Sequence, residues 1–413
     1  MSLLSNLKRE ANFLVKQRYF LAFLTVVFLL SVFAVWSGIS ETQTQLNTIE
    51  RLQEKGALDR ESVLAHQSSY GGAAYYSFHL TYSAPSPMAF ASMGQRDIYP
   101  WKHRVRMLAL EGQIYETDTE NPELSFLGRF DFAFLISVLL PLFIILLLHD
   151  LRSSEREAGR YDLLITTAGQ KKSLWLSRAV ILTTALGIAV LAPFIIGALY
   201  THAPLFSVVL IISVVMGHLA FWMLLTLGYT ASNVAAKQSS AQIASVLLAI
   251  WLGLAVLVPV GSDMAIDNMV HSPNGGEIVL TQREAVNNAW DIPFAETWEP
   301  FIATYAFQQV GDQKAETLSK AYRNASLEKD RLASLFALIS PPMLAQRLLS
   351  SIAETNTLAA MKYEQEVRDY HKKLRQFYYP LIFNKTEFNQ KNLLGLPQFI
   401  TFKNTLNTHK EKI

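Results

Sequence analysis

Five stretches of the chain are long, apolar and almost free of charged residues in their interiors. A helix that crosses a membrane needs about 20 mostly apolar residues, because each residue advances about 1.5 Å through a hydrocarbon layer of roughly 30 Å. Soluble proteins rarely contain five such stretches, so the pattern predicts a mainly α-helical membrane protein with five transmembrane helices. The predicted helices are Tyr19–Gly38, Leu127–His149, Leu176–Tyr200, Leu205–Tyr229 and Gln242–Gly261.

The positive charges of the short connections predict how these helices are oriented. Lys and Arg residues gather before the first apolar stretch and again at residues 150–175, between the second and third stretches. The THAPLF connection after the third stretch has none, and the connection at residues 230–241 carries Lys237. Because basic short connections stay in the cytoplasm, we expect the N-terminus and the connections at 150–175 and 230–241 to be cytoplasmic.

Two long polar stretches, at residues 39–126 and 262–413, then fall outside the cytoplasm. The first opens with a helical pattern and becomes rich in aromatic and turn residues, whereas the second is mostly helical by its apolar spacing. Within the second, Ser334–Leu349 is apolar but short, contains Arg347, and is predicted to be broken by Pro341-Pro342. We therefore expect it to be a packed or interfacial segment, and we expect no sixth span after it.

The first 18 residues form a predicted amphipathic helix along the inner membrane surface. Leu3, Leu7 and Leu14 share one side, and Lys8 and Lys16 can meet anionic headgroups. No small-residue cleavage site follows, so we interpret this region and the first apolar stretch as an uncleaved membrane segment. A plain anchor explains the helix at least as well as a gating role.

The composition agrees with a membrane protein and excludes several other classes. Of 413 residues, 51% are hydrophobic and 17% are charged, whereas soluble proteins carry roughly a quarter charged residues. The net charge of +2 is too small to indicate a nucleic-acid partner. Since the chain has no cysteine, disulfides, thiolate metal sites and cysteine nucleophiles are excluded.

The connection at residues 150–175 contains a predicted short amphipathic helix. Ser154 and Glu157 have the spacing of a capping box, apolar residues recur at helical spacing from Ala158 to Ala168, and Gly169 stands where a left-handed C-cap belongs. A helix held by membrane spans at both ends can transmit force if a cytoplasmic partner grips it. It can equally lie passively on lipid headgroups.

This connection and its flanks resemble the type-2 ABC transporter permeases. That family has a Glu-Arg-Glu-x-Gly stretch, a Leu-Leu-rich coupling helix, a small-residue turn and a basic entry to the third span. The runs PSPMAFASMGQRDIYPWKHRVR and SPPMLAQRLLSSIAETNT resemble a branch with large extracytoplasmic insertions. The resemblance and the charged helix face together give the candidate ATPase-coupling residues Glu155, Arg156, Glu157, Gly159, Arg160, Asp162, Leu163, Leu164 and Gly169.

The resemblance implies a permease subunit of the bacterial cytoplasmic membrane that has no catalytic residues and binds no cofactor itself. ATP and Mg²⁺ are expected on a separate ATP-binding subunit, and the permease is expected to pair with itself or with a related permease. The family norm is six spans, so five is a departure. In agreement with a separate ATPase, the chain has no GxxxxGK[ST] phosphate loop.

His218 is the one histidine well inside a predicted span, which makes it a candidate functional group. Trp222 lies one turn away, and a packing role for the histidine is the more common case. The nearly charge-free spans favour an amphipathic or apolar substrate that is exported. An alternative is a mechanical device that moves its external segments without transporting a solute. A membrane-bound enzyme is a third reading, but the sequence has no HExxH or GxSxG pattern to support it.

Overall fold

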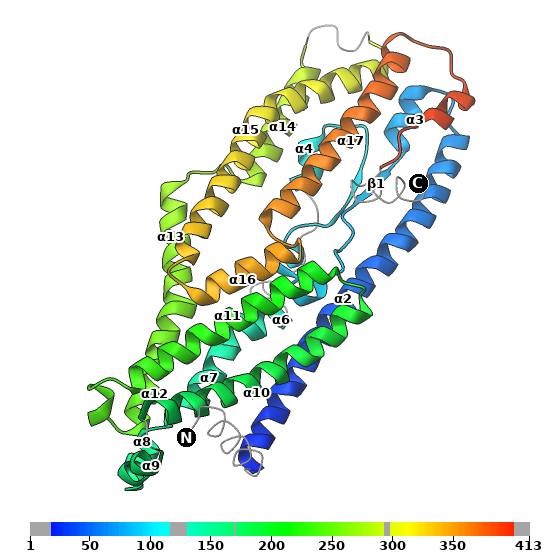
Figure 1. Ribbon diagram of the computed structural model, residues 1–413. Coiled ribbons are helices and arrows are strands. Elements are labelled where there is room, and N and C mark those ends of the chain that lie inside the picture. Colours follow the sequence, from blue (N-terminus) through cyan, green and yellow to red (C-terminus); the bar gives the residue numbers. More distant parts are fainter. Residues whose placement is uncertain (1–17, 116–129, 169–170, 293–297, 400–413) are drawn as a thin grey trace.

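The computed structural model describes residues 18–115, 130–168, 171–292 and 298–399, and these residues form an elongated, mainly helical molecule (Figure 1). Five helices are long and apolar enough to cross a membrane, which confirms the predicted fold class. They pack side by side in one half of the molecule, called here the apolar bundle. The polar stretches gather at the far end of this bundle and form what we call the distal unit (Figure 1).

The apolar bundle is built from helical segments with almost no charged residues, and the first helix, Arg18–Ala65, continues beyond the bundle as a polar helix. Buried aliphatic and aromatic side chains of these helices form its core, among them Phe132, Phe194 and Trp222. Its elements are α2 (Arg18–Ala65), α6 (Phe132–Phe134), the π-helix η3 (Leu135–Leu139), α7 (Leu140–Leu148), α10 (Lys171–Tyr200), α11 (Leu205–Thr230), α12 (Ser240–Leu252), the π-helix η5 (Gly253–Leu257) and α13 (Val258–Met269). The predicted amphipathic helix at residues 1–18 lies almost entirely outside the described residues.

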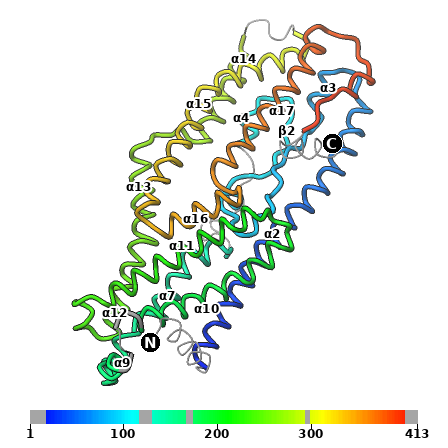
Figure 2. The backbone as a smooth tube through the Cα atoms, viewed as in Figure 1, coloured from blue at the N-terminus to red at the C-terminus, as the bar shows by residue number. Residues whose placement is uncertain are grey.

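Helix α2 joins the two halves of the molecule without a break. It has 48 residues, and at about 1.5 Å per residue it is about 70 Å long. The tube in Figure 2 shows it leaving the bundle and running along the distal unit. At Gly38 the backbone of η1 (Ala89–Ala91) approaches so closely that a β-carbon would overlap the carbonyl oxygen of Phe90. This close contact fixes α2 where it leaves the bundle.

Helix α16 (Pro341–Ile352) lies between the bundle and the distal unit, and it contacts both π-helices. The Ser340 hydroxyl donates to the carbonyl of Leu254 in η5 at 2.5 Å, and the Ser137 hydroxyl of η3 donates to Gln346 at 3.1 Å. Its neighbour α15 ends at Ala337, just before the two prolines that were predicted to break the chain. The apolar segment therefore packs against the spans through Leu349.

The distal unit surrounds a two-stranded antiparallel ribbon with helices. Strands β1 and β2 pair so that His79 faces Val105, and their inner face packs on α17 through Tyr363 and Val367. The elements of the unit are α3 (Tyr70–Tyr76), β1 (His79–Tyr82), η2 (Gly94–Asp97), β2 (Lys102–Val105), α4 (Leu110–Tyr115), α14 (Gly275–Trp290), α15 (Pro300–Ala337), α17 (Thr357–Phe383) and η7 (Gln390–Gly395).

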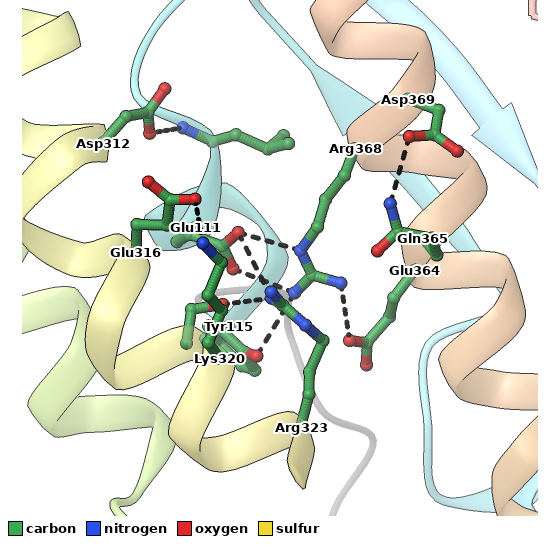
Figure 3. A network of polar contacts seen from close by, with 12 residues as sticks. Glu111, Tyr115, Asp312, Glu316, Lys320, Arg323, Glu364, Gln365, Arg368 and Asp369 are labelled. Carbon is green, nitrogen blue, oxygen red and sulfur yellow. Dashed lines mark hydrogen bonds and ion pairs between the residues drawn. The ribbon is translucent and has the colours of Figure 1, made fainter.

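A buried ionic cluster ties α4, α15 and α17 together (Figure 3). The Arg368 guanidinium donates to both carboxylate oxygens of Glu111, at 2.8 and 2.9 Å, and to Glu364 at 3.3 Å. Arg323 adds a second positive charge 3.9 Å from Glu111. Burial raises the pKa of both carboxyls; Arg368 outweighs this at Glu111, whose pKa is lowered, but not at Glu364, whose pKa stays raised. Two carboxylates and two guanidiniums balance one another, which is how charges persist in an interior.

Three buried histidines, His79, His103 and His371, also lie in the distal unit and are called here the histidine trio. Burial lowers the pKa of His79 to about 3 and the pKa values of His103 and His371 to about 4. Each ring uses one nitrogen, for example His371 Nε2 with the carbonyl of Arg106 at 3.1 Å. The trio is therefore neutral at pH 7.

Candidate functional site

The connection between the second and third candidate spans forms two short helices, α8 (Ser153–Glu157) and α9 (Tyr161–Ala168), at the end of the bundle opposite the distal unit (Figure 1). The sequence predicted one helix that starts with a capping box at Ser154, and this prediction is wrong. Arg152 holds the N-cap position of α8 without a side-chain cap, and the Ser154 hydroxyl donates back to the carbonyl of Asp150 at 2.6 Å.

Gly159 divides the two helices. Its φ of 69° lies in the left-handed region, which glycine adopts without the steric cost that other residues meet. The chain thus turns after α8 and starts α9 in a new direction. The sequence placed the left-handed glycine at Gly169, ten residues later, and Gly169 lies outside the described residues.

Helix α8 is bound to the connection that precedes α12. The Glu157 carboxylate accepts from the backbone N–H of Ser240 at 2.9 Å and from its hydroxyl at 3.1 Å. The Arg156 guanidinium donates to the carbonyls of Ala236, at 2.6 Å, and Ala235, at 2.9 Å. A carboxylate at a helix N-terminus satisfies a free N–H and meets the positive end of the helix dipole. Glu157 therefore fastens α8 to the start of α12.

Helix α9 is bound to the start of α10. The Tyr161 ring stacks on Trp175 with ring centroids 5.9 Å apart and an interplanar angle of 12°. Glu155 accepts from Arg160 at 2.9 Å and pairs with Arg178 of α10 at 3.3 Å, and the Glu155 side chain is only 15% exposed. Glu155 is therefore an internal ion-pair partner rather than a surface charge.

The solvent-facing part of the site is small and lies on α9. Leu163 is 66% exposed although it is a large apolar residue, and Asp162 beside it is exposed as well. Leu164 is half-buried against the cluster of Leu174 and Trp175. Of the residues that the sequence singled out, Glu155 is turned inward and Arg156 is half-buried, whereas Glu157, Gly159, Arg160, Asp162 and Leu163 are exposed.

Sequence reasoning missed the partners that hold this site, above all Ser240, Arg178 and Trp175. One signal was present. Ser239 and Gln242 form a capping box at the start of α12, and the spacing that defines this motif is visible in the sequence. This capping box marks the start of α12, and the backbone N–H of Ser240, the first residue of that helix, binds Glu157.

His218 is placed in the bundle core, far from α8 and α9. Its ring is 5% exposed and packs edge-on against Trp222, with ring centroids 6.3 Å apart. His218 Nε2, Trp222 Nε1 and the Thr226 hydroxyl have no hydrogen-bond partner within the described residues. These three side chains follow one another at one-turn spacing along one face of α11.

Comparison with known proteins gives one match, and it covers part of the chain. Residues 277–401 match the family described as Domain of unknown function (DUF3526). This segment includes most of α14 and all of α15, α16 and α17, and it therefore covers the C-terminal helices of the distal unit and the helix that joins it to the bundle. Neither a curated protein nor a solved structure matches the chain. Among the described residues, no group of three or more His, Asp or Glu residues is arranged to hold a metal ion.

Proposed function

We propose that this chain is the membrane subunit of an ATP-driven transporter and that α9 is the surface on which a separate ATP-hydrolysing subunit pushes. The resemblance to type-2 ABC permeases suggests this role, and the contacts of α8 and α9 support it. Leu163 and Asp162 are exposed on α9, and the adjoining helix α8 is bound to two different spans, α12 through Glu157 and α10 through Glu155. The single observation that carries the proposal is this double attachment.

The attachment gives a physical route for force. A push on α9 reaches α10 through the Tyr161–Trp175 stack and through Glu155 with Arg178. It reaches α12 through Glu157 and Ser240. Rigid helices joined by several contacts move together, and such contacts between packed elements are what coupled motion requires. Both spans would then shift when the partner subunit closes on ATP.

The geometry changes which residues test the proposal. Glu155 and Glu157 both bond to other segments, Glu155 to Arg178 and Glu157 to Ser240, so charge reversal at either carboxylate would loosen the segment itself. Leu163→Glu replaces an exposed apolar contact and touches none of the internal bonds. We expect Leu163→Glu to abolish the stimulation of the partner ATPase by this chain while the thermal unfolding midpoint of the chain stays unchanged.

The matched control is Thr166→Glu, an exposed position on the same helix whose hydroxyl bonds only within α9. The measurement is ATP hydrolysis by the subunit that co-purifies with the chain, reconstituted in lipid nanodiscs. If Leu163→Glu and Thr166→Glu both leave ATP hydrolysis coupled to the chain, α9 is not the docking surface.

A mechanical device that moves its distal unit without transporting a solute is the second candidate function. It is favoured by the continuity of α2, which passes from the bundle into the distal unit as one helix, and by α16, which bonds to the π-helices of two spans. Since the chain has no cysteine, spin labels on single introduced cysteines in α9 and α14 can report their separation. A distance change during ATP turnover without solute accumulation in vesicles would select this function over export.

A further inference from the structure

A cavity of about 620 Å³ lies in the distal unit, between the polar half of α2 and the β1–β2 ribbon. Pockets that hold small ligands usually measure about 300–1,000 Å³. The α2 residues that line it begin at Leu52, about 20 Å along the helix beyond Gly38, at 1.5 Å per residue. The cavity is therefore well separated from the apolar bundle and from α9.

Much of the wall is aromatic or aliphatic. Successive residues of a strand point to opposite faces, so Leu80 and Tyr82 of β1 face the cavity while His79 and Thr81 are buried on the other face of the ribbon. Across from the ribbon, α2 contributes apolar side chains as well. The apolar lining includes Leu52, Val63, Tyr76, Phe78, Tyr370 and Phe399. An apolar wall of this extent suits a hydrocarbon chain.

The rim of the cavity is positively charged. Lys55, Arg60 and Arg104 line it against a single carboxylate, Asp59. Asp59 pairs with Arg104 at 3.4 Å, but these two side chains are 67% and 58% exposed, and such exposed pairs are weak and readily exchanged. The Arg104 guanidinium lies 3.6 Å from the centroid of the Phe78 ring, which holds this charge directly over the apolar wall.

Arg60 is the most informative residue of the rim. It is half-buried and forms no ion pair within the part of the chain that the structure describes. A guanidinium that is only partly exposed to water is stabilised by a compensating partner, and its planar fork matches the geometry of a carboxylate. An anionic group in the cavity would supply that partner.

We propose that this cavity binds a single-chain anionic amphiphile, with the hydrocarbon chain against the aromatic wall and a terminal carboxylate on Arg60. The chemical class follows from the two halves of the lining, one apolar and one cationic. The proposal stands on the cavity alone and does not require α9 to be a coupling surface. If the chain is an exporter, the ligand is a member of its substrate class.

The test is photo-crosslinking on the full chain in phosphatidylcholine nanodiscs. The probe is palmitic acid with a diazirine on its chain, and the labelled peptides are identified by mass spectrometry, which separates labelling in the cavity from labelling in the bilayer. We expect adducts in residues 52–63 and 76–82. Unlabelled palmitic acid should compete for these adducts, whereas hexadecanol and hexadecylamine should not.

Two pairs of variants sharpen this test. Gly56 lines the cavity, and a β-carbon added there meets no atom within 4 Å, so Gly56→Trp fills the cavity without a clash at its β-carbon and should remove the adducts. Leu58→Trp, on the same helix at a 62% exposed position outside the lining, is its control. Arg60→Gln should weaken competition by palmitic acid about tenfold or more, since the substitution removes a hydrogen bond between charged groups. Arg51→Gln, on an exposed part of α2, should leave it unchanged.

Three results would overturn the proposal. The first is equal competition by palmitic acid and hexadecanol, and the second is labelling of the cavity peptides that survives in Gly56→Trp. The third is labelling that is absent in the full chain and arises only after removal of residues 400–413, because the end of this chain would then be the occupant. An ATPase that stays coupled to the chain while the cavity is unlabelled would refute this proposal alone. A labelled cavity in a chain that is not coupled to an ATPase would refute the proposed function alone.

Discussion

The ionic cluster of the distal unit allows a quantitative prediction, because Arg368 is its central residue. Replacement of Arg368 by Met removes one charge from between Glu111 and Glu364, whose side chains are 12% and 10% exposed. Removal of one partner of a buried pair typically costs about 3–5 kcal/mol, because the remaining charge stays buried without compensation. A 150–250-residue unit shifts by about 2–4 °C per kcal/mol. We therefore expect the unfolding midpoint of the distal unit to fall by about 6–20 °C.

The magnitude has a second source that makes it depend on pH. A buried carboxylate that loses its partner can take up a proton, and this costs about 1.4 kcal/mol for each pH unit between its pKa and the solution pH. The destabilisation by Arg368→Met relative to the natural chain should therefore be smaller at pH 5 than at pH 7.5. In the same way, Glu111→Gln added to Arg368→Met should recover part of the lost stability.

The assay is thermal unfolding of the full chain in nanodiscs, followed by intrinsic fluorescence. The control is Arg331→Met on the outer surface of α15, where Arg331 is 73% exposed and pairs only with Glu328 of its own helix at 3.3 Å. An exposed pair of this kind contributes about 0–1 kcal/mol. Equal effects of Arg368→Met and Arg331→Met, or an Arg368→Met effect that does not change with pH, would refute the argument that burial makes this cluster costly to break.

Three further predictions concern pH, packing and the connection at residues 150–175. The histidine trio is neutral in the folded chain, whereas in the unfolded chain it binds protons below about pH 6.5. The free energy of unfolding should therefore be unaffected by the trio above that pH and should fall as the pH approaches 4. Each histidine contributes a loss of about 2 kcal/mol at pH 5. Asp312 acts in the opposite direction, since burial raises its pKa to about 6. The measured loss of stability between pH 7 and pH 5 should therefore be less than the sum for the three histidines. Greater stability at pH 5 than at pH 7 would contradict the neutral state of the histidine trio. Gly38→Ala should destabilise the chain by about 1–3 kcal/mol because it forces α2 away from Phe90, whereas Gly217→Ala, with nothing within 4 Å, should leave the unfolding midpoint unchanged or raise it. Glu157→Gln weakens the hydrogen bond to the Ser240 N–H and should lower the stability of the α8 attachment by about 1 kcal/mol. The measurement is the rate of proteolysis after Arg156, which should increase. An unchanged cleavage rate would show that α8 is held by other contacts.

The sequence by itself determined the membrane class and the approximate positions of the spans. Apolar stretches of about 20 residues have one stable solution in a bilayer, a helix that satisfies its own backbone hydrogen bonds. This rule needs no knowledge of neighbouring segments, and all five predicted stretches overlap helices long enough to cross a membrane, the second from Phe132 onward. The break at Pro341 was equally local, since two consecutive prolines do not continue a helix.

Only the tertiary structure decided which groups the charged residues of the 150–175 connection bind. Glu155, Arg156 and Glu157 read as one exposed charged run, but their partners Arg178, the carbonyls of Ala235 and Ala236, and Ser240 come from segments that are distant in sequence. The cavity at Arg60 has the same origin, because α2 and β1 create it only by packing side by side. Helical periodicity reports which residues share a face, whereas the identity of the neighbour on that face depends on how distant segments pack, and this the local pattern does not contain.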